Sequence, residues 1–258
     1  MSIRIEKLEF QFGKLKTFAM LIHPDNEGAS PGHLAIFTHG YTASKRDVLP
    51  WGVRLAEEGI PSIVFDLPGH YLGNYYEVES FDDFVNDSPR LFEVAYSKLL
   101  THGYKLGPSG KLILGGHSLG ALTAFRSSTL ECFSNLPKIL LGVGFGISST
   151  DGNHIFQSRF YKKTLEVREQ LVSPCLKASN LFDWIHDQKE KIQVQAERVH
   201  LITGQNDVVV GEKGAEKLKK KLIQKGITST TLSRPKNLPH HQPEGASVHI
   251  YAEFKYLY

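Results

Sequence analysis

The 258-residue chain has little of what marks several large protein classes. It has two cysteines, Cys132 and Cys175, which are too few for the disulfide framework of a small secreted protein. A single bridge between them stays open as an alternative, and we favour two free thiols in a reducing compartment. The formal net charge of +3 is small for this length. It therefore gives no indication of a strong attraction to nucleic acid or to a membrane surface.

Long apolar runs are also missing. No segment approaches the roughly 18 uncharged apolar residues that a membrane span requires, and residues 1–6 lack the apolar stretch of a signal peptide. The chain has no His-Glu-x-x-His motif and no zinc-type pairs of cysteines, so we expect neither a metal nor a cofactor. We therefore expect a cytoplasmic protein that acts on a small molecule. Nothing in these features indicates an oligomeric state.

What the chain does have is the pattern of an α/β protein. Apolar residues make up 41% of it, enough for one large core. Residues 3–11 and 15–23 alternate in polarity and predict a hairpin that turns at Gly13. Between 34 and 143, short apolar segments alternate with helical ones, which predicts a mostly parallel, doubly wound sheet with helices on both faces. The interpretation includes one long helix over residues 81–100.

The most informative segment is residues 111–122, Lys-Leu-Ile-Leu-Gly-Gly-His-Ser-Leu-Gly-Ala-Leu. An apolar run of strand length ends in glycines, Ser118 stands between Gly116 and Gly120, and a helix-forming run follows. This is Gly-x-Ser-x-Gly in the strand–turn–helix context of a nucleophile elbow. A serine at such a sharp turn needs almost no side chain two residues before and after it, because the strand and the helix come close there.

Three further segments accompany the elbow. They are Thr-His-Gly-Tyr-Thr at 38–42, Asp-Leu-Pro-Gly-His at 66–70 and Gly-Gln-Asn-Asp-Val-Val at 204–209. Together with the elbow, they make the chain resemble the serine esterases and lipases of the α/β-hydrolase superfamily over nearly its whole length. The segment at 66–70 continues Tyr-Leu-Gly-Asn, where the family usually continues Gly-x-Ser, and this departure affects the expected pocket wall.

The resemblance implies roles for several residues. Ser118 would be the nucleophile and Asp207 the acid that orients a histidine, while Asp151 is a second candidate for the acid. The backbone N–H groups of Tyr41 and Leu119 would form the oxyanion hole. The order serine, acid, histidine along the chain is the one expected of this fold.

Two adjacent histidines compete for the role of general base. Neighbouring residues of an extended loop point in roughly opposite directions, so only one of His240 and His241 should face Ser118. Pro243 suits the first turn of a closing helix, which places His241 in the bend before that helix. We therefore favour His241 and keep His240 as the alternative.

Residues 147–195 interrupt the alternation of strands and helices. By the resemblance they form a helical lid inserted between an N-terminal part of the core (1–146) and a C-terminal part (196–258), within one domain overall. A packed helical excursion without a gating role is the alternative. The lysine-rich helix expected over 212–225 is interpreted as a solvated outer face rather than a binding surface.

These features predict a serine hydrolase that cleaves a carboxylic ester through an acyl-enzyme intermediate. A thioesterase, lactonase, amidase or peptidase would need the same triad, so those activities remain alternatives. A binding protein that has kept the fold without catalysis is a further one. Serine rather than aspartate at the elbow is evidence against the chemistry of dehalogenases and epoxide hydrolases in this fold.

Overall fold

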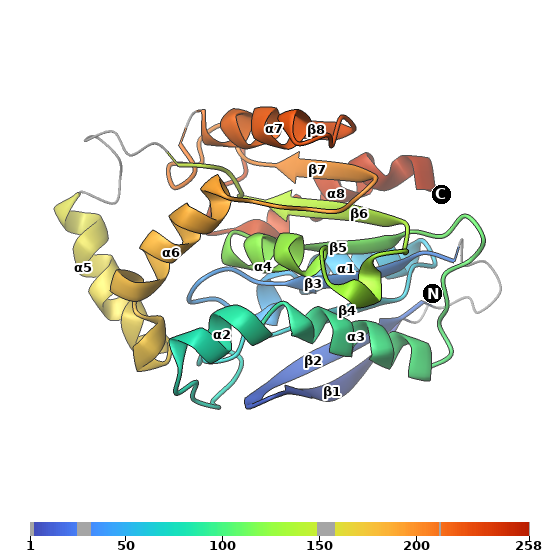
Figure 1. The fold of residues 1–258 in the computed structure, drawn as a ribbon, viewed down its shortest axis with the longest axis horizontal. Coiled ribbons are helices and arrows are strands. Elements are labelled where there is room, and N and C mark those ends of the chain that lie inside the picture. Colours follow the sequence, from blue (N-terminus) through green and yellow to red (C-terminus); the bar gives the residue numbers. More distant parts are fainter. Residues whose placement is uncertain (1–2, 25–31, 149–157, 212, 258) are drawn as a thin grey trace.

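The computed structural model describes residues 3–24, 32–148, 158–211 and 213–257. Its centre is one sheet of eight strands in the order β1-β2-β4-β3-β5-β6-β7-β8 (Figure 1). The first two strands form the predicted hairpin, and the six from β3 onward are parallel to one another. In chain order the strands are β1 Arg4–Phe12, β2 Leu15–His23, β3 Leu34–Thr38, β4 Ser62–Phe65, β5 Leu112–His117, β6 Lys138–Val143, β7 Arg198–Ile202 and β8 Thr230–Ser233.

The hairpin turns where the sequence predicts, since Gly13 has a positive φ of 55° between β1 and β2. Strand β2 then pairs antiparallel with β4, which joins the hairpin to the parallel part of the sheet. Every residue of β3, β4, β5 and β6 is buried. Continuous burial of this kind follows from helices that cover both faces of parallel strands.

Helices cover the two faces as the doubly wound pattern predicts (Figure 1). Helices α1 (Leu49–Glu57) and α8 (Ser247–Phe254) pack on one face, where they share an apolar cluster with the strands. The other face carries α2 (Phe81–Asp87), α3 (Arg90–Thr101), α4 (Leu119–Ser127) and α7 (Gly214–Gln224). The sheet therefore lies between two apolar layers.

The single helix predicted over 81–100 is wrong, because α2 and α3 are separate helices that meet at Ser88 and Pro89. Proline has no N–H to donate, and its ring clashes with the carbonyl group four residues earlier. That carbonyl group belongs to Val85, and its oxygen accepts a hydrogen bond from the guanidinium group of Arg126 instead.

Beyond β6 the structure describes two more helices, α5 (Arg159–Arg168) and α6 (Ala178–Glu190). Figure 1 shows them past the carboxyl ends of the parallel strands. The segment between them is attached to the loop after β4: Ser173 N–H donates to Gly69 O at 2.8 Å, and Tyr71 N–H donates to Leu171 O at 2.8 Å. Helices α5 and α6, the described part of the excursion predicted from residue 147, thus lie at the edge of the sheet where ligands bind in this class of fold.

Two expectations from composition can be compared with the structure. Cys132 and Cys175 are both free, which confirms the preference for unbridged thiols. Within the described parts of the chain, no helix combines the length and the apolar character that crossing a bilayer requires.

One hydrogen bond connects α1 to the segment that follows the two candidate histidines. Trp51 is fully buried, packs edge-on against Phe37, and donates its indole N–H to Pro243 O at 2.8 Å. The bond spans 192 positions of the chain, so it fixes the C-terminal segment on the sheet.

Replacing Trp51 by phenylalanine should therefore lower the free energy of unfolding by about 1–3 kcal/mol, because Pro243 O is left buried without its donor. Urea denaturation measures the change. Trp184→Phe is the matched control, since Trp184 is only half-buried and no acceptor for its indole N–H is found in the described chain. An equal loss in the two variants would contradict the role given to this hydrogen bond.

Candidate active site

Ser118 stands in a strained turn between β5 and α4. Its φ of 50° and ψ of −109° lie in a region that residues with side chains rarely adopt. The flanking glycines make room for this turn: a Cβ on Gly116 would lie 2.5 Å from the carbonyl carbon of Gly120, and a Cβ on Gly120 would lie 2.4 Å from His39 O. Ser118 N–H donates to Val143 O at 2.9 Å, which ties the turn to the end of β6.

The two predicted oxyanion donors lie beside this turn. Leu119 is the first residue of α4, where backbone N–H groups have no partner within the helix. Tyr41 lies in the loop after β3, next to Thr42, which has a positive φ of 55°. No acceptor for the N–H of Tyr41 or of Leu119 is found in the part of the chain that is described. Both residues line the cavity that Ser118 also lines.

Asp207 is positioned by its own turn and contacts one of the two histidines. One carboxylate oxygen, Oδ1, accepts the N–H groups of Val209 and Val210 at 3.0 and 2.9 Å. The other, Oδ2, lies 2.8 Å from Nδ1 of His240. Burial alone would raise the pKa of Asp207, but the His240 ring and the two N–H groups outweigh it and lower that pKa. The ionised carboxylate accepts the Nδ1 proton and leaves Nε2 of His240 as a proton acceptor.

The preference for His241 is therefore wrong in its geometry, because His240 is the histidine that contacts Asp207. The expected extended loop is instead a turn, closed by a hydrogen bond of 3.1 Å from Gln242 N–H to Pro239 O. This turn directs His240 inward, where it is buried, and leaves His241 exposed with its ring nearly perpendicular to that of His240. Asp151, the second candidate for the acid, lies outside the described residues.

A cavity of about 680 Å³ opens in front of these groups. Its floor comes from the ends of the strands, and α5 and α6 supply much of its wall. The two helices contribute apolar and charged side chains in nearly equal number. From α5 and α6 the lining residues are Tyr161, Thr164, Arg168, Phe182, Asp183, Ile185, His186 and Lys189.

Known proteins were compared with the chain by sequence and by structure. No family model matches the sequence, and no curated protein matches it. The structure, in contrast, is similar to many solved ones. Among them is a soluble variant of monoglyceride lipase from Saccharomyces cerevisiae bound to a substrate analogue, with a TM-score of 0.63 and 14% identity, covering 100% of this chain and 96% of that one.

Two more of these structures show how broad the group is. XC6422 from Xanthomonas campestris, described as an α/β serine hydrolase without a lid, has a TM-score of 0.58 and 16% identity over 97% of this chain and 94% of its own. The epoxide hydrolase VrEH1 from Vigna radiata has a TM-score of 0.56 and 16% identity over 98% of each chain.

The chain has the α/β-hydrolase fold. This confirms the fold predicted from the elbow and its neighbouring segments. Because the structures that share it carry out different reactions, the chemistry has to be argued from the residues at the site.

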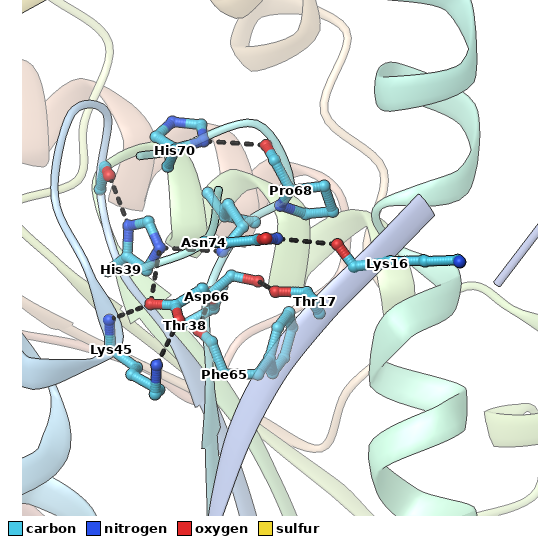
Figure 2. A network of polar contacts seen from close by, with 12 residues as sticks. Lys16, Thr17, Thr38, His39, Lys45, Phe65, Asp66, Pro68, His70 and Asn74 are labelled. Carbon is cyan, nitrogen blue, oxygen red and sulfur yellow. Dashed lines mark hydrogen bonds and ion pairs between the residues drawn. The ribbon is translucent and has the colours of Figure 1, made fainter. Parts of the chain in front are cut away.

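In this α/β-hydrolase fold a buried polar network that includes His39, Asp66 and His70 joins the loops after β3 and β4 (Figure 2). His39 Nε2 accepts the N–H of Leu67 at 2.8 Å, so the ring is neutral and its Nδ1–H donates to Gly40 O at 2.8 Å. Asp66, fully buried, accepts both the backbone N–H of Lys45, at 2.7 Å, and the ammonium group of the same residue. These contacts join the loops after β3 and β4.

His70, the last residue of the Asp-x-Pro-Gly-His segment, belongs to the same network. It donates from Nδ1 to Pro68 O at 3.0 Å, and its ring packs edge-on against that of His39. Burial lowers the pKa of His39 and of His70 to about 3. His70 therefore supports the loop in its neutral form and is not part of the cavity lining.

The structure also brings in residues that sequence reasoning missed. Arg168, at the end of α5, donates to Thr42 Oγ1 at 2.8 Å and to Tyr41 O at 3.1 Å, and so ties that helix to the loop after β3. His117 is buried, and its ring centroid lies 4.7 Å from that of His240. His117 directly precedes Ser118 within the motif, so its place beside the site could have been inferred. Nothing in the sequence around Arg168 marks it.

For a metal ion the described residues offer no cluster of three or more His, Cys, Asp or Glu side chains. Two ionisable groups of the site, Asp207 and His240, are instead paired with each other. The arrangement is suited to proton transfer by side chains.

The buried neutral histidines predict how stability depends on pH. In the unfolded chain a histidine has a pKa of about 6.5. Between this value and about 3, the unfolded state binds a proton at His39 and at His70 that the folded state does not bind. The free energy of unfolding should therefore fall as the pH is lowered from 7 to 5, by about 2 kcal/mol for each of these histidines.

Replacing His70 by asparagine, whose amide can still donate to Pro68 O, should reduce this fall by about 2 kcal/mol. Urea denaturation of both proteins at pH 7 and pH 5 measures it, and His186→Asn serves as the control because His186 is exposed. The same fall in His70→Asn as in the unmodified protein would show that His70 does not contribute in this way.

Proposed function

We propose that the protein is a serine hydrolase that cleaves a carboxylic ester, with Ser118 as nucleophile, His240 as general base and Asp207 as the acid that orients it. The observation that carries the proposal is the hydrogen bond of 2.8 Å between His240 Nδ1 and Asp207 Oδ2, beside a cavity that both Ser118 and His240 line. A histidine held in this way has its second nitrogen available to take a proton.

In the first half of the reaction Ser118 Oγ attacks the carbonyl carbon of the ester. His240 Nε2 takes the hydroxyl proton, and the imidazolium that forms is stabilised by the carboxylate of Asp207. The carbonyl oxygen becomes an oxyanion, which the N–H groups of Tyr41 and Leu119 would bind. The bond to the leaving alcohol then breaks, and His240 returns the proton to that alcohol.

In the second half a water molecule attacks the acyl-enzyme. His240 takes a proton from the water, and the same two N–H groups would bind the second oxyanion. The bond to Ser118 Oγ breaks, Ser118 regains its proton from His240, and the carboxylic acid leaves. The turn at Ser118, with its φ of 50°, presents Oγ to the cavity in both halves of the reaction.

The alternatives within this chemistry are thioesters, lactones and amides, which need the same groups. The similar structures include esterases and a monoglyceride lipase, which supports an ester. The similar epoxide hydrolase is a weaker guide, because serine rather than aspartate stands at the elbow of this chain. A binding protein without activity is disfavoured, because all three triad residue types are present and Asp207 contacts His240.

We also propose that residues 147–195 are a cap over the cavity, inserted between the core parts 1–146 and 196–258. The support is that α5 and α6 supply much of the cavity wall and that Arg168 attaches α5 to the oxyanion loop. XC6422, which shares the fold, is described as lacking a lid, so a cap is not a requirement of this fold.

Replacing each of the two histidines by alanine in a separate variant tests the proposal. His240→Ala should lower kcat for p-nitrophenyl butyrate by about a thousandfold or more, as Ser118→Ala should, because these residues act as a unit. His241→Ala should stay within about threefold of the unmodified enzyme, since His241 has no contact with Asp207 of the kind that His240 makes. Initial rates of p-nitrophenol release measure all three.

His241→Ala is also the matched control for folding, because it changes the neighbouring residue in the same turn. If His240→Ala kept near-normal activity while His241→Ala abolished it, the base would be His241 despite the geometry. If Ser118→Ala kept more than about a tenth of the rate, the nucleophile would be misassigned.

A further inference from the structure

One ionisable side chain of the cavity has no role in the proposed mechanism. Lys189 lies near the end of α6, lines the same cavity as Ser118, and is only 8% exposed. Its ammonium nitrogen lies 5.0 Å from the centroid of the Phe145 ring. No hydrogen bond or ion pair of Lys189 is found within the described parts of the chain. A buried lysine in this situation needs a physical explanation.

The ammonium group of Lys189 stays charged near neutral pH. Burial lowers its pKa to about 8, and the negative charge of Asp207 acts in the opposite direction. A buried ammonium has three protons to donate, and leaving them without acceptors costs several kcal/mol. The attraction to the face of Phe145 offsets only a small part of this cost. The charge is thus held in the cavity without a full partner.

The other charged groups of the cavity do not supply that partner. Both oxygens of Asp207 already accept hydrogen bonds, from His240 and from two backbone N–H groups. Asp183 is exposed and lies in the helix six residues before Lys189, and Asp47 lies in the turn before α1; neither forms an ion pair with Lys189. The second cation, Arg168, is bonded to the loop of Tyr41.

We propose that Lys189 binds a carboxylate of the substrate, so that the preferred substrates are esters that carry a carboxylate in addition to the scissile bond. This inference rests on the proposed ester hydrolysis. Apolar side chains of the same wall, Phe182 and Ile185, would contact the carbon chain between the two ends. Lys189 would be a specificity-determining residue and would take no part in the bond changes at Ser118.

Two matched pairs of esters test this, because the carboxylate could stand on the acid or on the alcohol part. The first pair is p-nitrophenyl hexanoate and mono-p-nitrophenyl adipate, which differ by a terminal carboxylate on the acyl chain. The second pair is hexyl acetate and 6-acetoxyhexanoate, which differ by a terminal carboxylate on the alcohol part. Their hydrolysis is measured by the release of acetate. In each pair the ratio of kcat/KM, charged over neutral ester, isolates the contribution of the carboxylate.

In at least one pair, Lys189→Met should lower this ratio by about 10- to 100-fold, because a charge-assisted hydrogen bond is lost. The kcat/KM for the neutral ester should not fall by more than about threefold, since methionine fills nearly the same space. Lys189→Arg keeps the charge and should retain most of the ratio. Lys191→Met is the control, because Lys191 directly follows the end of α6 and is exposed.

Unchanged ratios in both pairs would overturn the role of Lys189, and so would an equal loss on charged and neutral esters in a variant that is folded by circular dichroism. If Lys189→Met did not fold, a Lys189→Gln variant would give the same comparison. If the unmodified enzyme hydrolysed none of the four esters, this result would instead contradict the proposed function itself. The two failures are therefore distinguishable.

Discussion

The site depends on a backbone conformation that the chain can adopt at Ser118 only because glycines flank it. Gly116 and Gly120 approach other backbone atoms so closely that a Cβ on either would overlap them. The strain of the turn, of the order of 1–3 kcal/mol, must be offset by its surroundings. The buried strand β5 before it, helix α4 after it and the hydrogen bond to Val143 O all hold it in place.

The groups around this turn come from distant parts of the chain, and buried polar contacts hold them together. Asp207 contacts His240, while His39 and Asp66 join the loops after β3 and β4. Each of these contacts places a titratable side chain out of water, where it is stable only with its partner. Because His39 and His70 are buried and neutral in this network, the free energy of unfolding also depends on pH.

Much of the fold could be predicted because it follows from periodicity and from glycine and proline positions. The hairpin, the parallel strands and the elbow are local in origin. The preference for His241 does not agree with the geometry, because a turn at Pro239, and not an extended loop, directs His240 toward Asp207. Arg168 and Lys189 could not be predicted, because their partners or surroundings lie far away in the sequence and no local pattern marks them.

The central claim is that Ser118 is a nucleophile activated by His240. Its most direct test is reaction of the intact protein with a fluorophosphonate, followed by peptide mass mapping of the modified residue. Stoichiometric labelling at Ser118, lost in a His240→Ala variant and kept in a His241→Ala variant, is the predicted result. Labelling at another residue, or no labelling of a folded protein, would contradict the account.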